Sequence, residues 1–274
     1  VLNSVDWGSV ESTHHSSKYV NQIGVYVTRT SLETRQVEII GWVIGDNEAT
    51  MTQRKSILNR FFNPQQAVDL FYKNYVLRFL PNTSVRYSAT IVENNEVVCK
   101  FSVIGYCPDP LFGEETENKI TAASTIPKFH FPLIISQTPN PPGGIIFGLR
   151  QPSLIVAIEN SGAVAIGMRI VFKAIGTLSG PSLINVDTQK YFKVNKEMTA
   201  GEEIVIDTII GQKKIEGTLN GLTSNYFKYR DFDSEWLQLQ VGTNLFRYDA
   251  DQNIENLEVY IYFSNKYLEV QECY

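Results

Sequence analysis

The second half of the sequence contains short strand-forming segments and no segment with helical spacing. Runs rich in Val, Ile, Tyr and Phe are expected to be strands at residues 153–159, 166–175, 185–192, 203–208, 213–219, 235–239, 245–250 and 257–263. Turn residues such as Asn160-Ser-Gly162 and Asn220-Gly221 separate them, at a spacing of about 8–12 residues. Because many short strands at this spacing are typical of a sandwich or a jelly roll, the C-terminal part is predicted to be a β-sandwich.

The N-terminal half contains the one convincing helical segment, at residues 50–62. Thr50 and Gln53 have the spacing of a capping box, and Asn47 offers a further capping side chain upstream. Asn63-Pro64 ends the helix, because a residue before proline avoids the helical region. Strands are expected on both sides of the helix, at residues 24–30, 34–44, 67–72 and 75–80. The fold class is therefore mainly β with one helix.

A β-hairpin is predicted at residues 85–104. Its two strands, 85–92 and 97–104, are joined through Asn94-Asn95, a pair that tolerates positive φ and suits a tight turn. The segment holds only two acidic side chains, and a lone hairpin is marginally stable in water, so a neighbouring molecule could cover it. The candidate residues for a contact between subunits are Val85, Tyr87, Ile91, Asn94, Asn95, Val97 and Phe101.

Residues 107–152 interrupt the strand pattern with many prolines and the Gly143-Gly144 pair. This composition is typical of a linker, with extended pieces such as residues 129–135. His130 lies there between Phe129 and Phe131, and packing or a backbone hydrogen bond is its expected role. We therefore expect two domains, an N-terminal one at residues 1–135 and a C-terminal one at residues 136–274.

Composition excludes several classes of function. The net charge is -5 and the pI about 5.4, so the chain is poorly suited to grip nucleic acid, although DNA could slide past it. The three cysteines, Cys99, Cys107 and Cys273, form no CxxC pair and predict neither a disulfide framework nor a zinc site; a cytoplasmic folding environment is the simple interpretation. Since no run of 18 apolar residues occurs, no membrane span is expected.

Candidate catalytic and metal-binding groups are few. His14 and His15 are adjacent, so on a strand they point to opposite faces, and a solvated segment is favoured over a metal site. Asp231, Asp233 and Glu235 would share one face of a strand and could attract Ca²⁺ or act as a carboxylate pair, but an exposed acidic loop is favoured. The sequence has no GxSxG, P-loop or HExxH motif. We predict no catalytic residue, metal or cofactor.

Trp236 is the one candidate for contact with a sugar. A tryptophan on a sandwich strand can stack on a sugar ring, yet large aromatic residues more often fill sandwich cores. A core position is therefore the favoured interpretation.

Several segments together resemble the distal tail proteins of long-tailed phages, the siphovirus tail component family. In the N-terminal half these are residues 34–45, the helix ending at residues 58–64, the strand at 67–72, and the hairpin that runs into Cys107-Pro-Asp-Pro110. In the C-terminal half they are residues 185–188, the Gly-Glu and Ile-Asp-Thr segment at 199–208, and the segment at 234–248 with its Ser, Trp, Leu, Gly and Asn.

The resemblance implies a hexameric ring between the tail tube and the tail tip, in the virion, from a protein made in the host cytoplasm. The N-terminal domain would be a ring-forming sandwich or split barrel, whose hairpin adds to the next subunit around a channel that DNA passes. The C-terminal domain would be a galectin-like β-sandwich. Implied partners are further copies of the chain, the tail tube protein, the tail-associated lysin or tip protein, and baseplate or receptor-binding proteins, with no membrane contact.

Three alternatives remain at this stage. The chain could be a carbohydrate-binding adhesion module that recognises host cell-wall sugar through Trp236. It could be a glycosidase that uses the acids at 231–235, although no motif supports this. It could also be the tail tube subunit itself, although a tube subunit would not need a second sandwich.

Overall fold

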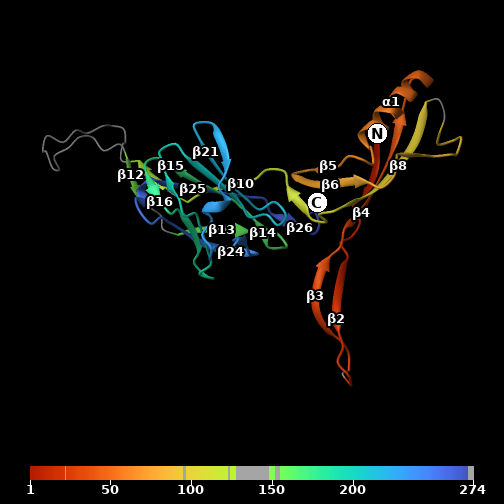
Figure 1. Ribbon diagram of the computed structural model, residues 1–274. Coiled ribbons are helices and arrows are strands. Elements are labelled where there is room, and N and C mark those ends of the chain that lie inside the picture. Colours follow the sequence, from red (N-terminus) through yellow and green to blue (C-terminus); the bar gives the residue numbers. More distant parts are fainter. Residues whose placement is uncertain (22, 95–96, 123, 128–147, 152–154, 271–274) are drawn as a thin grey trace. The chain divides into compact units, whose positions relative to one another are not determined.

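The computed structural model describes residues 1–21, 23–94, 97–122, 124–127, 148–151 and 155–270 (Figure 1). These residues form a mainly β protein with one α-helix, α1 (Glu48–Phe61), and two short 3-10 turns, η1 (Phe227–Tyr229) and η2 (Ile254–Asn256). The fold class predicted from the sequence is confirmed. The chain divides into two compact units, Val1–Glu115 together with Lys266–Tyr274, and Thr116–Asn265.

The division falls earlier than the expected boundary at residue 135. Leu111 and Phe112 are buried in the first unit, whereas β10 (Asn118–Thr121) already pairs with β25 (Leu257–Phe263) in the second. The segment that we expected to be a linker therefore contributes strands. Residues 129–135, His130 and the expected boundary itself lie outside the described residues.

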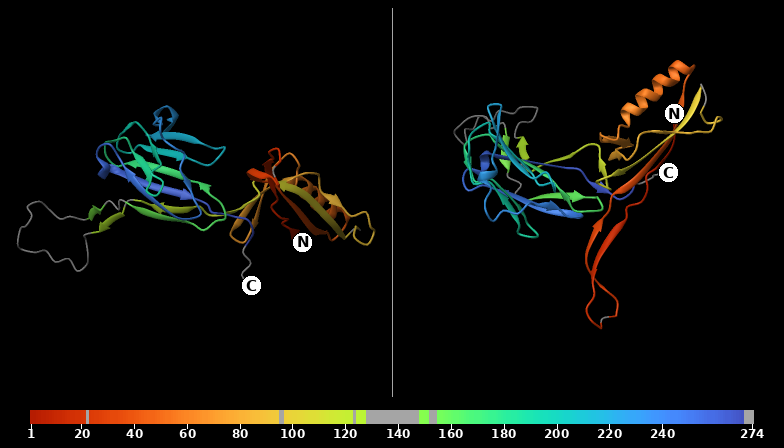
Figure 2. Two further views of the ribbon diagram at one scale, coloured as in Figure 1. Left: turned by 90° about the horizontal axis from the view of Figure 1, so that it is seen from below. Right: turned by 45° about the vertical axis from the view of Figure 1, so that its right-hand side comes forward.

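The first unit is built on one curled sheet with the strand order β1-β4-β8-β6-β9-β26, in which β5 lies beside β6 and β7 beside β8 (Figure 2). Alternate residues of β4, including Val37, Ile39 and Val43, point into a core shared with Phe79 and Val103. The strands are β1 (Leu2–Asp6), β4 (Arg35–Ile44), β5 (Val68–Tyr72), β6 (Tyr75–Pro81), β7 (Arg86–Tyr87), β8 (Val98–Cys107), β9 (Phe112–Glu114) and β26 (Lys266–Tyr267).

Helix α1 begins earlier than residue 50 because its capping box is formed by Asn47 and Thr50. The Thr50 amide donates to Asn47 Oδ1 at 2.9 Å, and the Asn47 amide donates to Thr50 Oγ1 at 3.1 Å. Asn47 is extended at φ -161°, so it lies just outside the helix as a cap should. The expected pairing of Thr50 with Gln53 is therefore replaced by a pairing one turn upstream.

The segment expected to be a long hairpin at 85–104 is only partly one. Its second strand is β8, but the first is reduced to β7, which pairs Arg86 with Ser102 and Tyr87 with Phe101. Ser88 Oγ donates to Glu93 Oε2 at 2.8 Å and Lys100 Nζ donates to Glu93 Oε1 at 3.1 Å. These contacts hold residues 88–93 in a compact loop, which ends the strand early.

The long hairpin of the first unit is instead formed by β2 (Ser12–Ser17) and β3 (Tyr26–Leu32), of which only a strand at 24–30 was expected. Figure 1 shows it projecting away from α1 and β5 as a two-stranded ribbon. Every residue of β2 is exposed, as is every residue of β3 except Ser31. Asn21 and Gly24, at φ 67° and 83°, supply the left-handed conformations of its turn.

The second unit is a β-sandwich. Ile170, Ile206 and Ile261 from a six-stranded sheet meet Phe192 and Phe246 from a four-stranded sheet in one buried cluster. The six-stranded sheet has the order β10, β25, β15 (Arg169–Ala174), β20 (Glu203–Asp207), β21 (Lys214–Leu219), β22 (Leu222–Asn225). The four-stranded sheet has the order β13 (Val156–Asn160), β24 (Gly242–Asp249), β17 (Ser182–Asn185), β18 (Tyr191–Lys193).

Three short strand pairs complete this unit: β11 (Ser124–Pro127) with β12 (Gly148–Gln151), β14 (Ile166–Gly167) with β23 (Gln238–Leu239), and β16 (Leu178–Ser179) with β19 (Glu197–Met198). Residues 185–192 were expected to form one strand, but they contain a turn between β17 and β18. Asn185 Oδ1 accepts from the amides of Asp187 and Thr188 at 3.1 and 2.9 Å, and Gln189 has φ 58°. A side-chain turn of this kind competes with strand continuation.

No helix among the described residues has the length and hydropathy that crossing a membrane requires.

Candidate assembly interface

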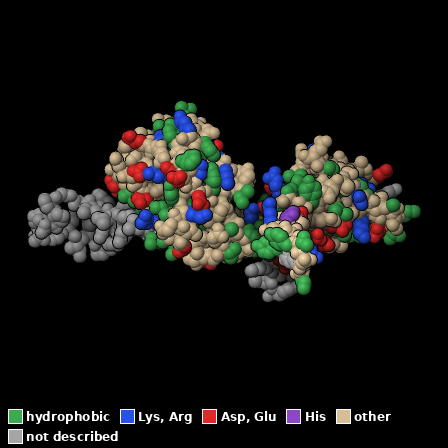
Figure 3. Space-filling view, turned by 60° about the horizontal axis from the view of Figure 1, so that its bottom comes forward, with side chains coloured by type: hydrophobic (Ala, Val, Ile, Leu, Met, Phe, Trp, Pro, Cys, Tyr) green, Lys and Arg blue, Asp and Glu red, His purple; other side chains and the backbone are tan. Residues whose placement is uncertain are grey.

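The end of the β2–β3 hairpin carries apolar side chains that are more than half exposed to solvent. Val20 is 92% exposed and Ile23 fully exposed, and Tyr19, Val25 and Tyr26 are each more than half exposed. Figure 3 shows hydrophobic side chains gathered beside histidine on this part of the first unit. A two-stranded hairpin alone is marginally stable in water, and apolar patches without cover mark interaction sites. The hairpin is therefore the clearest candidate for contact with another molecule.

Arg35 anchors the base of this hairpin. Its guanidinium donates to the carbonyl oxygens of Pro110 at 2.8 Å, Gly8 at 3.1 Å and Trp7 at 3.2 Å, and also to that of Leu268. It lies 4.7 Å above the ring centre of Phe112. Burial lowers the pKa of Arg35 from its ordinary value. Four chain segments are thus joined immediately after β3, which gives the hairpin a fixed base.

A groove lies on the same unit between strands β1 and β5. It has a volume of about 690 Å³ and is lined by residues of β1, by residues of β5, by Phe61 and Phe62 at the end of α1, and by Ile39. Leu2, Phe61 and Phe71 line it and are 61%, 55% and 62% exposed. A second hollow of about 390 Å³ shares Leu2, Ile39 and Phe62 with it. Together they form a largely apolar surface along β1, β5 and the end of α1.

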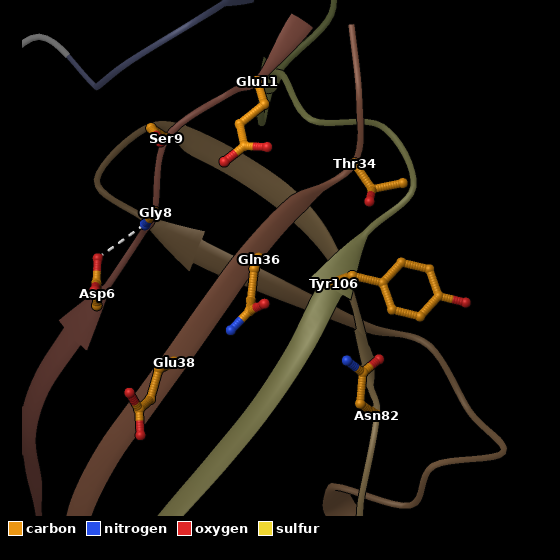
Figure 4. Close-up of a pocket in the computed structure, with 9 residues that line it drawn as sticks. All are labelled: Asp6, Gly8, Ser9, Glu11, Thr34, Gln36, Glu38, Asn82 and Tyr106. Atoms are coloured by element: carbon orange, nitrogen blue, oxygen red, sulfur yellow. Dashed lines mark hydrogen bonds between the residues drawn. The ribbon is translucent and has the colours of Figure 1, made fainter. Parts of the chain in front are cut away.

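A third hollow, near the base of the hairpin, is acidic (Figure 4). It has a volume of about 610 Å³ and is lined by Asp6, Glu11 and Glu38 with Gln36, Asn82, Tyr106 and other small polar residues, and by no Lys or Arg. Asp6 Oδ1 accepts a hydrogen bond from the Gly8 amide at 2.9 Å. The described residues contain no group of three or more His, Cys, Asp or Glu that could hold a metal ion. This surface would repel phosphate groups.

The candidate interface residues predicted at 85–104 divide into two kinds. Val85 and Phe101 are buried in the core of the first unit, and Tyr87 donates to Asn59 Oδ1 of α1 at 3.0 Å. Ile91, at 84% exposed, and Val97, at 48%, are open to solvent. Asn94 Oδ1 accepts from Lys55 Nζ at 3.1 Å, and Asn95 lies outside the described residues.

Trp236 is half-buried and packs against the core of the second unit. Its ring centre is 5.0 Å from that of Phe192 and 5.9 Å from that of Phe227. Lys213 Nζ and the Arg230 guanidinium lie 5.4 and 5.6 Å from its ring centre. Because two aromatic rings and two cations already contact this ring, it is poorly placed to stack on a sugar.

The other polar candidates also have structural partners. Asp231 accepts from Tyr191 Oη at 3.1 Å and from Asn195 Nδ2 at 2.8 Å, and the Asn195 hydrogen bond is the main cause that lowers the pKa of Asp231. Glu235 pairs with Lys190 at 2.6 Å. His14 and His15 lie exposed on β2, as expected for a solvated segment.

The hairpin and the groove were missed at the sequence level. Residues 12–17 are Ser, Thr and His, which give no alternation of apolar side chains. The one local signal was the Asn21 to Gly24 turn between them and the strand at 24–30. The groove has no local signal, because strands far apart in sequence form it.

Two family models match the chain, one in each unit. The model of the siphovirus-type tail component C-terminal domain, named for SPP1 Dit, matches residues 161–267, and that of the phage tail protein RIFT-related domain matches residues 3–82. The chain belongs to the siphovirus tail components and is a Dit-like distal tail protein. It is thus a structural component of the phage virion, located at the tail tip.

One solved structure has a similar fold. The crystal structure of SPP1 Dit (gp 19.1), described as a paradigm of the hub adsorption apparatus in phages that infect Gram-positive hosts, is 13% identical, with a TM-score of 0.68. The match covers 97% of this chain and 93% of that one. A chain of the phage P2 baseplate in its activated conformation with Ca is also 13% identical over 98% of this chain and 92% of that one, with a TM-score of 0.49. No curated protein matches the chain.

Proposed function

We propose that this Dit-like protein forms a hexameric ring that connects the tail tube to the baseplate or tail fibre apparatus. The observation that carries the proposal is the β2–β3 hairpin, whose tip exposes apolar side chains to solvent. In a ring, a neighbouring copy would cover these side chains. A hairpin that docks on a different surface of the next copy makes a heterologous interface, and such an interface gives a ring when the rotation between copies closes.

The acidic hollow supports a channel that DNA passes without being held. Asp6, Glu11 and Glu38 present negative charge with no cation among the lining residues, which disfavours phosphate contacts. The tail tube protein, the tail-associated lysin or tip protein, and baseplate or receptor-binding proteins are the proposed partners of the ring. Ile91 and Val97, the exposed members of the segment at 85–104, remain proposed contacts between subunits.

A structural role is proposed rather than catalysis, in keeping with the family. The carbohydrate-binding alternative is not favoured. Its one candidate, Trp236, is packed against Phe192, Phe227 and two cations.

The proposal is tested by placing charge on the hairpin. Ile23→Asp is expected to lower the fraction of assembled protein measured by light scattering, because the carboxylate would have to be buried in the interface. Phe232→Asp is the matched control, since Phe232 is 92% exposed on the second unit, and it should leave assembly unchanged. Equal assembly of both variants and the wild type would contradict a role for the hairpin.

A further inference from the structure

Strand β22 lies at the edge of the six-stranded sheet and pairs only with β21 among the strands that the structure describes. The Tyr226 amide donates to the Ile215 carbonyl oxygen at 2.9 Å, just beyond the end of this pair. Because hydrogen-bonded and non-hydrogen-bonded pairs alternate along an antiparallel ladder, the amides of Thr223 and Asn225 point away from β21. A strand edge of this kind can accept an extended segment of another chain.

The corresponding edge of the four-stranded sheet is covered by the chain itself. The Asp231 amide donates to the Lys193 carbonyl oxygen at 3.0 Å, and the Glu235 amide donates to that of Tyr191 at 2.9 Å. The loop at 231–235 thus takes up the outer edge of β18. In β22, by contrast, all four residues are exposed, and none is charged or a proline, the residue types that commonly protect an open edge.

A hollow beside this edge can hold a side chain of an added segment. It has a volume of about 220 Å³ and is lined by residues 213–216, residues 223–225 and Phe227. Phe227 is 48% exposed, and its ring centre lies 5.9 Å from that of Trp236, which keeps the exposed ring in place. Apolar side chains that fill such hollows are the usual anchors of protein interfaces.

The charge beside the hollow favours an acidic partner. Lys213 lines the hollow and Lys228 directly follows Phe227, and neither forms an ion pair with a described residue, whereas four other lysines of the second unit do. Glu216, the one acidic residue that lines the hollow, is paired with Lys214 at 3.0 Å. Since the whole chain has a net charge of -5, these two cations form a local positive surface that complements carboxylates.

We propose that β22 and the hollow beside it bind an extended acidic segment of another virion protein, which adds to the sheet as a further strand. One apolar side chain of the segment enters the hollow beside Phe227, and its carboxylates meet Lys213 and Lys228. This inference rests on the proposed function, in which the protein binds other tail-tip proteins, and it names the binding surface and the chemistry of the partner.

A library of random short peptides displayed on mRNA tests the site. Peptides are selected on the immobilised full chain, and the binding of the most enriched peptide is then measured by fluorescence anisotropy. We expect the enriched peptides to combine Asp or Glu with an apolar residue, and their binding to weaken as salt is added, because exposed charges are screened.

Two variants examine the edge and the charge separately. Thr223→Pro removes an outward amide and leaves the ladder with β21 in place, and Lys213→Glu reverses a charge at the hollow. Each should weaken the binding of the selected peptide by about tenfold or more. Lys119→Glu is the matched control, since it makes the same charge change at an exposed position on β10 of the same unit, and it should bind the peptide as the wild type does. Circular dichroism checks that each variant is folded.

The outcomes separate this site from the ring. Enrichment of basic or wholly apolar peptides, no enrichment, or equal binding by the wild type and K213E would overturn the inference and leave the ring standing. The mass of the assembled species is read independently by light scattering and should be the same in every variant. A chain that selects acidic peptides through β22 but forms no ring would support this site and overturn the ring.

Discussion

Arg35 and Leu268 are 233 positions apart, and the guanidinium of Arg35 donates a hydrogen bond to the Leu268 carbonyl oxygen. The same guanidinium binds the carbonyl oxygens of Pro110, Trp7 and Gly8. The chain leaves the first unit to form the sandwich and is fastened back to it after β26, where the Tyr75 and Tyr267 rings also meet with centres 5.4 Å apart.

Replacing Arg35 by methionine is expected to destabilise the first unit by about 2–4 kcal/mol, because buried carbonyl groups lose their donor. Hydrogen exchange should show the effect most clearly in peptides at residues 266–270. Arg29→Met, an exposed change on β3, is the control and should alter the free energy of unfolding by about 0.5 kcal/mol or less. If hydrogen exchange at residues 266–270 were the same in Arg35→Met as in the wild type, the anchoring role would be contradicted.

Asn47→Ala is expected to cost about 1 kcal/mol in the first unit, since the capping box with Thr50 is lost. Urea unfolding followed by circular dichroism measures the change. Ser56→Ala, at an exposed position inside α1, is the matched control and should be neutral or slightly stabilising, because alanine favours the helix. Equal stability of N47A and the wild type would show that the cap contributes nothing.

Burial raises the pKa of the Cys107 thiol from 9.0 to about 11. The unfolded chain therefore loses this proton at lower pH than the folded chain. The contribution to stability is complete below about pH 9 and is lost as pH rises towards 11. The free energy of unfolding should fall over this window in the wild type and fall less steeply in Cys107→Ala. Identical slopes would contradict the assignment.

Trp236→Ala tests whether this residue serves packing or sugar binding. The half-buried ring contacts Phe192 and Phe227, so we expect a loss of about 2–3 kcal/mol in the second unit. Phe232→Ala, at a 92% exposed position, should have little effect on stability. On a glycan array, the wild type and the W236A variant should give the same result. A glycan that binds the wild type but not the variant would revive the carbohydrate-binding alternative.

Much of the fold follows from local sequence patterns. The sequence predicts the helix and the strands at 34–44, 67–72 and 75–80 because their signals are local. The spacing of apolar residues indicates each element, and Asn63-Pro64 ends the helix. The helix start was placed late because both Asn47 and Thr50 are able to cap, and only the backbone angles of Asn47 decide between them.

The candidate interface was less predictable. The strand at 85–92 was overestimated because Ser88, Glu93 and Lys100 form a side-chain network that ends β7. β2 was missed because its Ser, Thr and His residues carry no strand pattern. The groove depends on the packing of β1 and β5, which sequence spacing does not encode.

The absolute mass of the purified protein, by light scattering behind a sizing column, tests the central claim most directly. The account predicts a species near six times 31.0 kDa, seen as a ring with a central hole in negative stain. A single species of 31.0 kDa up to the highest concentration, or a continuous series of masses from an open filament, would contradict it.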